Sequence, residues 1–300
     1  MRVVRFSVLL LGVLLTFRSP GFECPRLPVV PPSGAPVRYT ESLLWEVTGP
    51  EEQRNFLFGT IHLAAEMTGQ PTPAVTSALM ASTQFGMEVI MDLETLMEIG
   101  ERMRYPDRKT LRAVLGDELF MRAITLLSGY GISESDAAQL KPWAVFTTLS
   151  LPPGTRSAPL DMVLMSTAQR TRKTIFGLET LAEQTTIFES IEMQHQVTLV
   201  AETVCHYEVL NQITADLIDD YRRRDLRAVY RHAERFQSPA QDLLTEELLV
   251  ARNLRLAQRM QRHLAAGGAF IAIGALHLPG TEGVLAHLVA HGYRVRAVAD

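Results

Sequence analysis

Two short segments of the sequence repeat a spacing of glycine and histidine that suits a metal centre. Gly59-Thr60-Ile61-His62 and Gly274-Ala275-Leu276-His277 each follow an apolar run, and leucine follows each histidine. With 19 glycines and 8 histidines in 300 residues, chance alone predicts roughly 0.5 such patterns. Neutral imidazoles are good ligands for divalent metals, so the pair indicates that His62 and His277 bind one ion. Two hydrogen-bonded structural histidines are the alternative interpretation.

The third ligand of such a centre would be an acidic side chain, and Glu88 is the strongest candidate. It interrupts the apolar run FGMEVIM at 85–91, which is expected to be a buried strand. A carboxylate buried there needs a cation, which a metal or an arginine would supply. Two imidazoles and one carboxylate leave a coordination position open for water, and Glu88 is also a candidate general base. An edge strand with Glu88 facing water is the alternative.

These residues require an α/β fold to bring them together. The pattern predicts a central mixed sheet built from the N- and C-terminal segments, with a large helical insertion between them. Glycine at a strand end permits a tight turn that presents the histidine at the carboxyl edge of the sheet, where open α/β proteins place their sites. The expected strands are 42–47, 55–58, 85–91, 173–178, 269–274 and 293–298, and the stretches 93–165 and 179–266 are expected to be mainly helical.

The N-terminus has the pattern of an export signal. Arg2 and Arg5 precede an apolar run at 6–17, which is too short to span a bilayer. We therefore expect a signal peptide at 1–22, a proline-rich linker at 23–37 and one domain at 38–300, in a protein exported to the periplasm. The membrane would be contacted only through that signal.

Charge and cysteine content narrow the possible partners. The net charge of −4 lacks the basic surface that nucleic acid binding needs, so nucleic acid is not an expected partner. Cys24 and Cys205 are the only cysteines. A buried free thiol at Cys205 is the favoured interpretation, and an oxidising compartment would allow the two to pair.

Other polar residues have simpler interpretations from the sequence alone. Glu66 and Glu282 fit exposed element ends, Asp161 fits a helix cap, and Arg252 fits a solvated helix face. Neither HExxH nor a Gly-x-Ser-x-Gly, dinucleotide or phosphate-loop motif is present, which excludes those classes of enzyme.

The order of motifs resembles the TraB/GumN family, which is related to the Tiki metalloproteases and, more distantly, to the ChaN and erythromycin esterase groups. The segments that carry the resemblance are LLWEVTG (43–49), FLFGTIHL (56–63), FGMEVIMD (85–92), KPW (141–143), PLDMVLMSTAQ (159–169), IFGLETLAEQ (175–184), LLVARN (248–253) and AFIAIGALHLPGTEGVLAHLVAHGYRV (269–295).

The resemblance implies an α/β core and a divalent-metal peptidase site that uses His62, His277 and Glu88. It also makes Arg252 a candidate member of the site, able to steady an oxyanion. Asp161 and Glu179 match family positions without an assigned role.

Two functions follow as hypotheses. The first is a peptidase that uses Zn²⁺, Mn²⁺ or Co²⁺ to activate water for attack on a peptide or protein substrate. The second is a non-catalytic protein that binds a peptide signal or haem on the same fold. The metal, the substrate and the oligomeric state are left open by the sequence.

Overall fold

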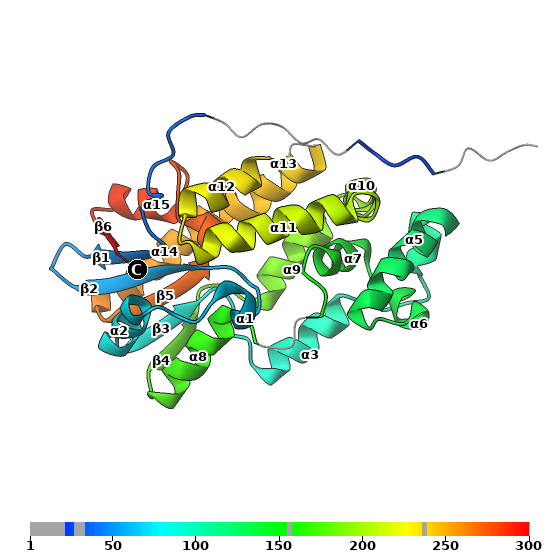
Figure 1. The fold of residues 1–300 in the computed structure, drawn as a ribbon. Coiled ribbons are helices and arrows are strands. Elements are labelled where there is room, and N and C mark those ends of the chain that lie inside the picture. The colour runs from blue at the N-terminus through cyan, green and yellow to red at the C-terminus, as the bar shows by residue number, and fades with distance from the viewer. Residues whose placement is uncertain (1–21, 27–33, 155–157, 236–238, 300) are drawn as a thin grey trace, which may run out of the picture.

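The computed structural model describes residues 22–26, 34–154, 158–235 and 239–299, and it centres on one six-stranded mixed sheet (Figure 1). The strand order is β4-β3-β5-β2-β1-β6. Strands β2, β5, β3 and β4 are mutually parallel, whereas β1 is antiparallel to both of its neighbours, β2 and β6. The α/β fold class expected from the sequence is therefore confirmed. The strands are β1 (Leu44–Thr48), β2 (Arg54–Thr60), β3 (Gln84–Met87), β4 (Thr174–Gly177), β5 (Ala269–Gly274) and β6 (Arg294–Val298).

Strand β3 is shorter than the apolar run that predicted it. Pairing with β4 ends at Met87, opposite Gly177, and the carbonyl of Glu88 then accepts hydrogen bonds from the backbone N–H groups of Leu178 and Glu179. Glu88 is thus the first residue beyond the strand and not a residue within it. Beyond it, Val89 and Met91 line a cavity, and Ile90 packs against the core of the sheet.

Helices cover both faces of the sheet, as Figure 1 shows. On one face lie α2 (Pro73–Ala81) and α8 (Leu160–Arg170), and on the other lie α14 (Ala251–Ala266) and α15 (Val284–Ala290). The short helix α1 (Ala65–Thr68) lies beyond the end of β2, beside α8. Phe58, Phe85 and Phe270 are fully buried in the sheet and pack against one another. The apolar strands therefore form the core that fixes the ends of β2, β3 and β5.

Most of the remaining helices form a second lobe with its own hydrophobic core, which agrees with the expected helical insertion. Trp143 and Phe188 stack within it. The lobe draws on both long connections, before and after β4. The remaining helices are α3 (Leu93–Arg102), α4 (Leu111–Leu115), α5 (Asp117–Leu127), η1 (Ser128–Tyr130), α6 (Glu134–Ala137), α7 (Pro142–Leu149), α9 (Leu181–Ser190), α10 (Met193–Cys205), α11 (Tyr207–Arg222), α12 (Leu226–Glu234), α13 (Pro239–Thr245) and the π-helical turn η2 (Glu246–Val250). Of these, α12 and the end of α11 instead pack Leu226, Val229 and Tyr221 into the core of the sheet.

A disulfide joins Cys24 to Cys205 at the end of α10, so the free thiol favoured from the sequence is wrong. Sequence spacing could not reveal the pair, because 181 residues separate the two cysteines. Neighbouring contacts hold the same segment against the helical lobe: the Phe22 ring lies on Arg122, and the Pro25 carbonyl is 2.7 Å from His206 Nε2. The beginning of the proposed linker is thus fixed to the domain.

Reduction of this disulfide is expected to lower the free energy of unfolding by about 2 kcal/mol. Closing a loop of this length stabilises the folded state by about 5 kcal/mol through the unfolded chain. Confining the roughly 20 residues between Cys24 and the first strand, which begins at Leu44, costs about 3 kcal/mol of that. Urea unfolding with and without reductant measures the difference. The Cys24→Ser protein should resemble the reduced protein and ignore reductant, whereas an unchanged wild-type midpoint would contradict this account.

Within the described ranges, none of the helices is long and apolar enough to cross a membrane. The signal peptide expected at 1–22 lies outside the described residues except for Phe22.

Candidate functional site

The carboxyl ends of the four parallel strands deliver four polar side chains to one edge of the sheet. His62 follows β2, Glu88 follows β3, Glu179 follows β4, and His277 lies in the single turn η3 (Ala275–His277) after β5. Parallel strands all end at the same edge, and this edge is where open α/β folds place ligands. The structure therefore brings together the three residues that the sequence selected as metal ligands.

The two motif glycines provide space and not an unusual backbone conformation. Gly274 has φ −54°, so the turn itself does not require glycine. A Cβ at Gly59 would lie 2.8 Å from Leu278 Cδ1 and 3.0 Å from Ala275 Cα, which would push η3 away from β2. A Cβ at Gly274 would lie 3.3 Å from His277 Cδ2, 3.4 Å from Glu88 Oε1 and 3.8 Å from His62 Nε2. Gly274 thus keeps open the space between the three candidate ligands.

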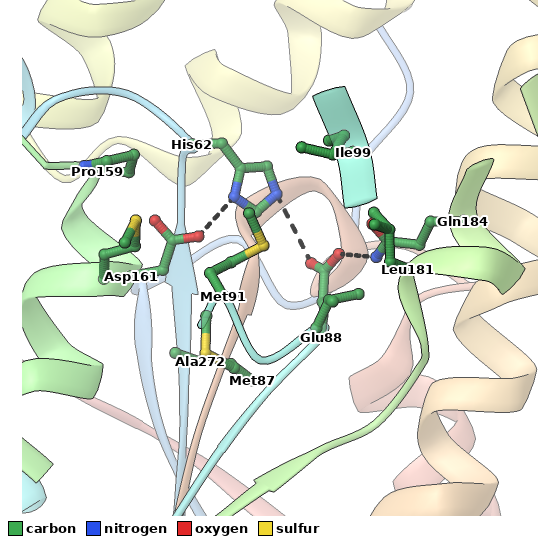
Figure 2. Close-up of a pocket in the computed structure, with 12 residues that line it drawn as sticks. His62, Met87, Glu88, Met91, Ile99, Pro159, Asp161, Leu181, Gln184 and Ala272 are labelled. Carbon is green, nitrogen blue, oxygen red and sulfur yellow. Dashed lines mark hydrogen bonds and ion pairs between the residues drawn. The ribbon is translucent and has the colours of Figure 1, made fainter. Parts of the chain in front are cut away.

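His62 is oriented by Asp161, as Figure 2 shows. Its Nδ1 lies 2.8 Å from Asp161 Oδ2, and its Nε2 lies 3.9 Å from Glu88 Oε1. Because a carboxylate accepts the hydrogen bond, Nδ1 carries a proton and Nε2 faces the centre. The side chain is 57% exposed, and its partial desolvation disfavours the charged ring. The hydrogen bond and charge of Asp161 and the charge of Glu88 outweigh this and raise the pKa of His62 to about 9. Metal binding at Nε2 would have to displace a proton.

His277 is oriented in the same way by an amide. Its Nδ1 lies 2.6 Å from Asn253 Oδ1, and its Nε2 lies 3.8 Å from Glu88 Oε1. The side-chain nitrogen of Asn253 donates to the Glu282 carbonyl at 2.7 Å, so its oxygen must face the histidine. Burial lowers the pKa of His277 to about 4 despite the charge of Glu88. The ring is therefore neutral near pH 7, with its Nε2 lone pair directed at the centre.

Glu88 is buried, so the exposed edge position considered as an alternative is wrong. Its Oε1 accepts the Gly274 N–H at 2.7 Å, and its Oε2 accepts from Gln184 Nε2 at 3.1 Å and from Arg252 at 2.5 Å. Burial raises the pKa of this carboxyl, but the charges of His277, His62 and Arg252 and the Gly274 N–H hold it well below its usual range. Because His277 is itself neutral near pH 7, the other three sustain the ionised carboxylate there.

Arg252 joins Glu88 to a second buried carboxylate. Its guanidinium donates to Glu179 Oε2 at 2.6 Å as well as to Glu88, and its side chain is 8% exposed. Arg255 adds a contact to Glu179 at 3.0 Å. In the π-helical turn η2 before α14, the Leu248 carbonyl accepts a further bond from Arg252. Arg252 is thus a buried member of the site and not the solvated residue that composition alone suggested.

The other candidates from the sequence lie in different places. Asp161 is within α8 and makes no capping hydrogen bond there, so the helix-cap interpretation is wrong; it binds His62 instead. Glu66 and Glu282 are exposed, as expected, and only the backbone of Glu282 serves the site.

Two supporting residues had no signal in the sequence that assigned them a role. Asn253 adjoins Arg252 on α14, and a rotation of about 100° per residue lets one reach His277 and the other Glu88. Gln184 lies one turn inside α9, whose start is fixed by a capping box of Thr180 and Glu183. Which atoms these side chains meet depends on the packing of distant helices.

The three candidate ligands fit a divalent metal in type and in the direction of their donor atoms, but as placed they lie too far apart to hold one. Both imidazoles hold their Nδ1 atoms in outer hydrogen bonds and direct Nε2 inward, which is the usual arrangement of metal-binding histidines. Ligands bonded to one ion at about 2.1 Å in tetrahedral geometry lie about 3.4 Å apart, so the observed 3.8 and 3.9 Å are slightly wide. As placed, no three acidic, histidine or cysteine side chains in the described chain are spaced to hold an ion.

Two apolar cavities meet at this centre. One, of about 210 Å³, extends beneath α3 and includes Met87, Met91 and Ile99. The other, of about 360 Å³, extends toward η2 and includes Phe188 and Leu248. His62, Glu88 and Gln184 line both. A substrate reaching the centre would therefore have apolar walls on both sides.

Taken together, the fold and the site define an α/β protein with paired, inward-facing histidines around a buried carboxylate at the sheet edge. The model of the TraB/PrgY/gumN family matches residues 43–297, which is most of the chain, so the chain belongs to this family. Comparison with curated proteins and with solved structures found no significant match.

Proposed function

We propose that this protein is a divalent-metal-dependent peptidase. The observation that carries the proposal is that two imidazoles from opposite ends of the chain direct their Nε2 atoms at the same oxygen of one buried carboxylate. An ion held by His62, Glu88 and His277 would polarise a peptide carbonyl and acidify the attacking water. Zn²⁺, Mn²⁺ and Co²⁺ are all compatible with this ligand set.

The roles of the supporting residues follow from their contacts. Asp161 and Asn253 fix the tautomer and the angle of the two histidines. Arg252 and Gln184 fix the carboxylate of Glu88 and keep it ionised. These residues pre-organise the ligands, which reduces the cost of assembling a metal site.

Glu88 is better suited to bind the metal than to accept a proton. An efficient general base has a pKa near the working pH, whereas the pKa of Glu88 lies well below its usual range. Most donors of Arg252 are engaged by Glu88, Glu179 and a backbone carbonyl. We therefore assign Arg252 the positioning of Glu88 in preference to contact with an oxyanion.

We also propose that the protein is exported, to the periplasm. The disulfide between Cys24 and Cys205 supports this, because such bonds persist in oxidising compartments. The apolar run behind Arg2 and Arg5 is consistent with the same route.

Metal analysis of the purified protein tests the proposed centre. We expect about one equivalent of a divalent metal in the wild type and loss of metal in His62→Ala and His277→Ala. His291→Ala is the matched control, because His291 is exposed and its ring bonds to the carbonyl of His287, one turn earlier. Peptide hydrolysis should disappear on chelation and return with metal. Unchanged metal content in both ligand variants would reject the proposal.

A single methyl group should close the centre without unfolding the protein. Gly274→Ala places a Cβ between the three ligands, so we expect metal affinity to fall about tenfold or more. Thermal unfolding of the metal-free protein should change little, because the backbone of Gly274 suits alanine. Gly100→Ala in α3, where a Cβ would meet nothing within 4 Å, is the control. Equal metal binding by Gly274→Ala and wild type would contradict the placement of the ion.

Haem binding is the less favoured alternative, because Glu88 Oε1 stands in front of both Nε2 atoms. An absorption band of haem in the purified protein would favour it.

A further inference from the structure

Gln184 lies at the boundary between the two apolar cavities. With His62 and Glu88, it is one of the three residues that line both of them. It projects from the first turns of α9, whose N-terminus is held by the capping box. The residue therefore stands on a rigid element where any extended substrate would cross from one cavity to the other.

The amide of Gln184 has one defined orientation. Its Nε2 lies 3.1 Å from Glu88 Oε2 and 3.2 Å from Glu179 Oε2. The flipped amide would place its oxygen against two carboxylate oxygens, which is repulsive, so nitrogen must face them. Within the described residues no group donates a hydrogen bond to Gln184 Oε1. The carbonyl is therefore a fixed acceptor that no donor of the described residues engages.

The cavities indicate what such an acceptor would meet. Their walls are mainly aliphatic or sulfur-containing side chains, among them Met87, Met162 and Leu181 on one side and Ile61 and Leu249 on the other. An extended peptide projects successive side chains to opposite sides of its backbone. A backbone N–H at Gln184 would then place two neighbouring side chains in the two cavities.

We propose that Gln184 is a positioning residue that accepts a backbone N–H of a peptide substrate, while the two cavities receive the apolar side chains on either side of that amide. The proposal deepens the peptidase function and rests on it for the choice of ligand. In this proposal, side chains of the protein select the peptide, and peptide binding does not depend on contact with the metal.

Peptide binding to the protein from which a chelator has removed the metal tests the proposal, because the peptide is then not cleaved. The probe is a fluorescein-labelled alanine heptapeptide with leucine at two central positions, measured by fluorescence anisotropy. Replacing each backbone amide in turn by an ester removes one N–H. We expect one ester to weaken binding to wild type roughly three- to tenfold, which is the value of one hydrogen bond. Gln184→Met should weaken binding of the parent peptide, which contains no ester, by a similar factor.

Combining the ester peptide with Gln184→Met distinguishes a direct hydrogen bond to the peptide from a general effect of the variant on folding. The ester that weakens binding to wild type should not weaken binding to Gln184→Met any further, because this variant lacks the acceptor of the hydrogen bond. Gln258→Met is the matched control, since Gln258 is exposed on α14, and it should bind every peptide like wild type. Equal ester costs in wild type and Gln184→Met would overturn the proposal. So would equal binding of peptides with aspartate in place of leucine, or no peptide binding at all.

Failure of the proposed peptidase function gives a different result. If the metal-loaded wild type binds the leucine peptide with the expected ester coupling but does not cleave it, the hydrolase is rejected and the role of Gln184 stands.

Discussion

Replacement of Arg252 by methionine is expected to lower the free energy of unfolding by about 3–5 kcal/mol, because it leaves buried carboxylates without their main partner. Glu88 and Glu179 have side chains that are 7% and 0% exposed. Methionine keeps the aliphatic packing of the arginine stem but supplies no donor. Urea unfolding of the metal-free protein, in which no bound ion contributes, measures the loss.

A matched variant on the same helix separates burial from ion pairing itself. Arg259 pairs with Glu183 at 2.6 Å, but both side chains are more than one third exposed. Exposed pairs contribute little, so Arg259→Met should cost less than about 1 kcal/mol. The double variant Glu88→Gln/Arg252→Met should recover part of the loss, because one of the uncompensated charges is removed. Similar losses for Arg252→Met and Arg259→Met would show that the buried network is not formed.

Substitution of Glu88 by glutamine is expected to lower the rate of metal-dependent peptide hydrolysis at least about 100-fold, because the site loses a metal ligand. Glutamine has nearly the same shape, but its neutral amide is a poor ligand for a divalent ion. We therefore expect metal content and activity to fall together in Glu88→Gln, with the metal measured on the same samples.

The relation between the two measurements distinguishes the roles of Glu88. Loss of activity with retained metal would show that Glu88 is the base and that His62 and His277 hold the ion without it. Full retention of both would remove Glu88 from the mechanism. Glu98→Gln is the control, because Glu98 lies on α3 and pairs with Arg102 four residues later.

Much of the sheet could be predicted from local pattern. The runs around Phe58, Phe270 and Ile175 are short, apolar and bounded by turn residues, and each became a strand. Where pattern and pairing differ, pairing decides: the run at 85–91 leaves the sheet after Met87 because its partner strand ends at Gly177. An apolar cavity wall and a buried strand have the same composition, so the sequence does not distinguish them.

Some residues of the site could be predicted from local sequence features, and others could not. His62, His277 and Glu88 could be selected because two matched glycine spacings and a lone acid in an apolar run are local features. The residues that orient these ligands could not be selected from the sequence. Asn253 and Gln184 have no distinctive spacing, and their roles depend on the atoms that they face. Asp161 looked like a helix cap because sequence shows a residue's place on its helix and not what lies opposite.

The sequence by itself determined the element types, the candidate ligands and the family resemblance, because periodicity and motif spacing are properties of neighbouring residues. Only the tertiary structure decided that Cys24 meets Cys205, that Arg252 is buried between two carboxylates, and that the two imidazoles face one oxygen. These contacts join residues far apart in the chain, and they exist only because the parallel strands end at a common edge and the helices pack over it.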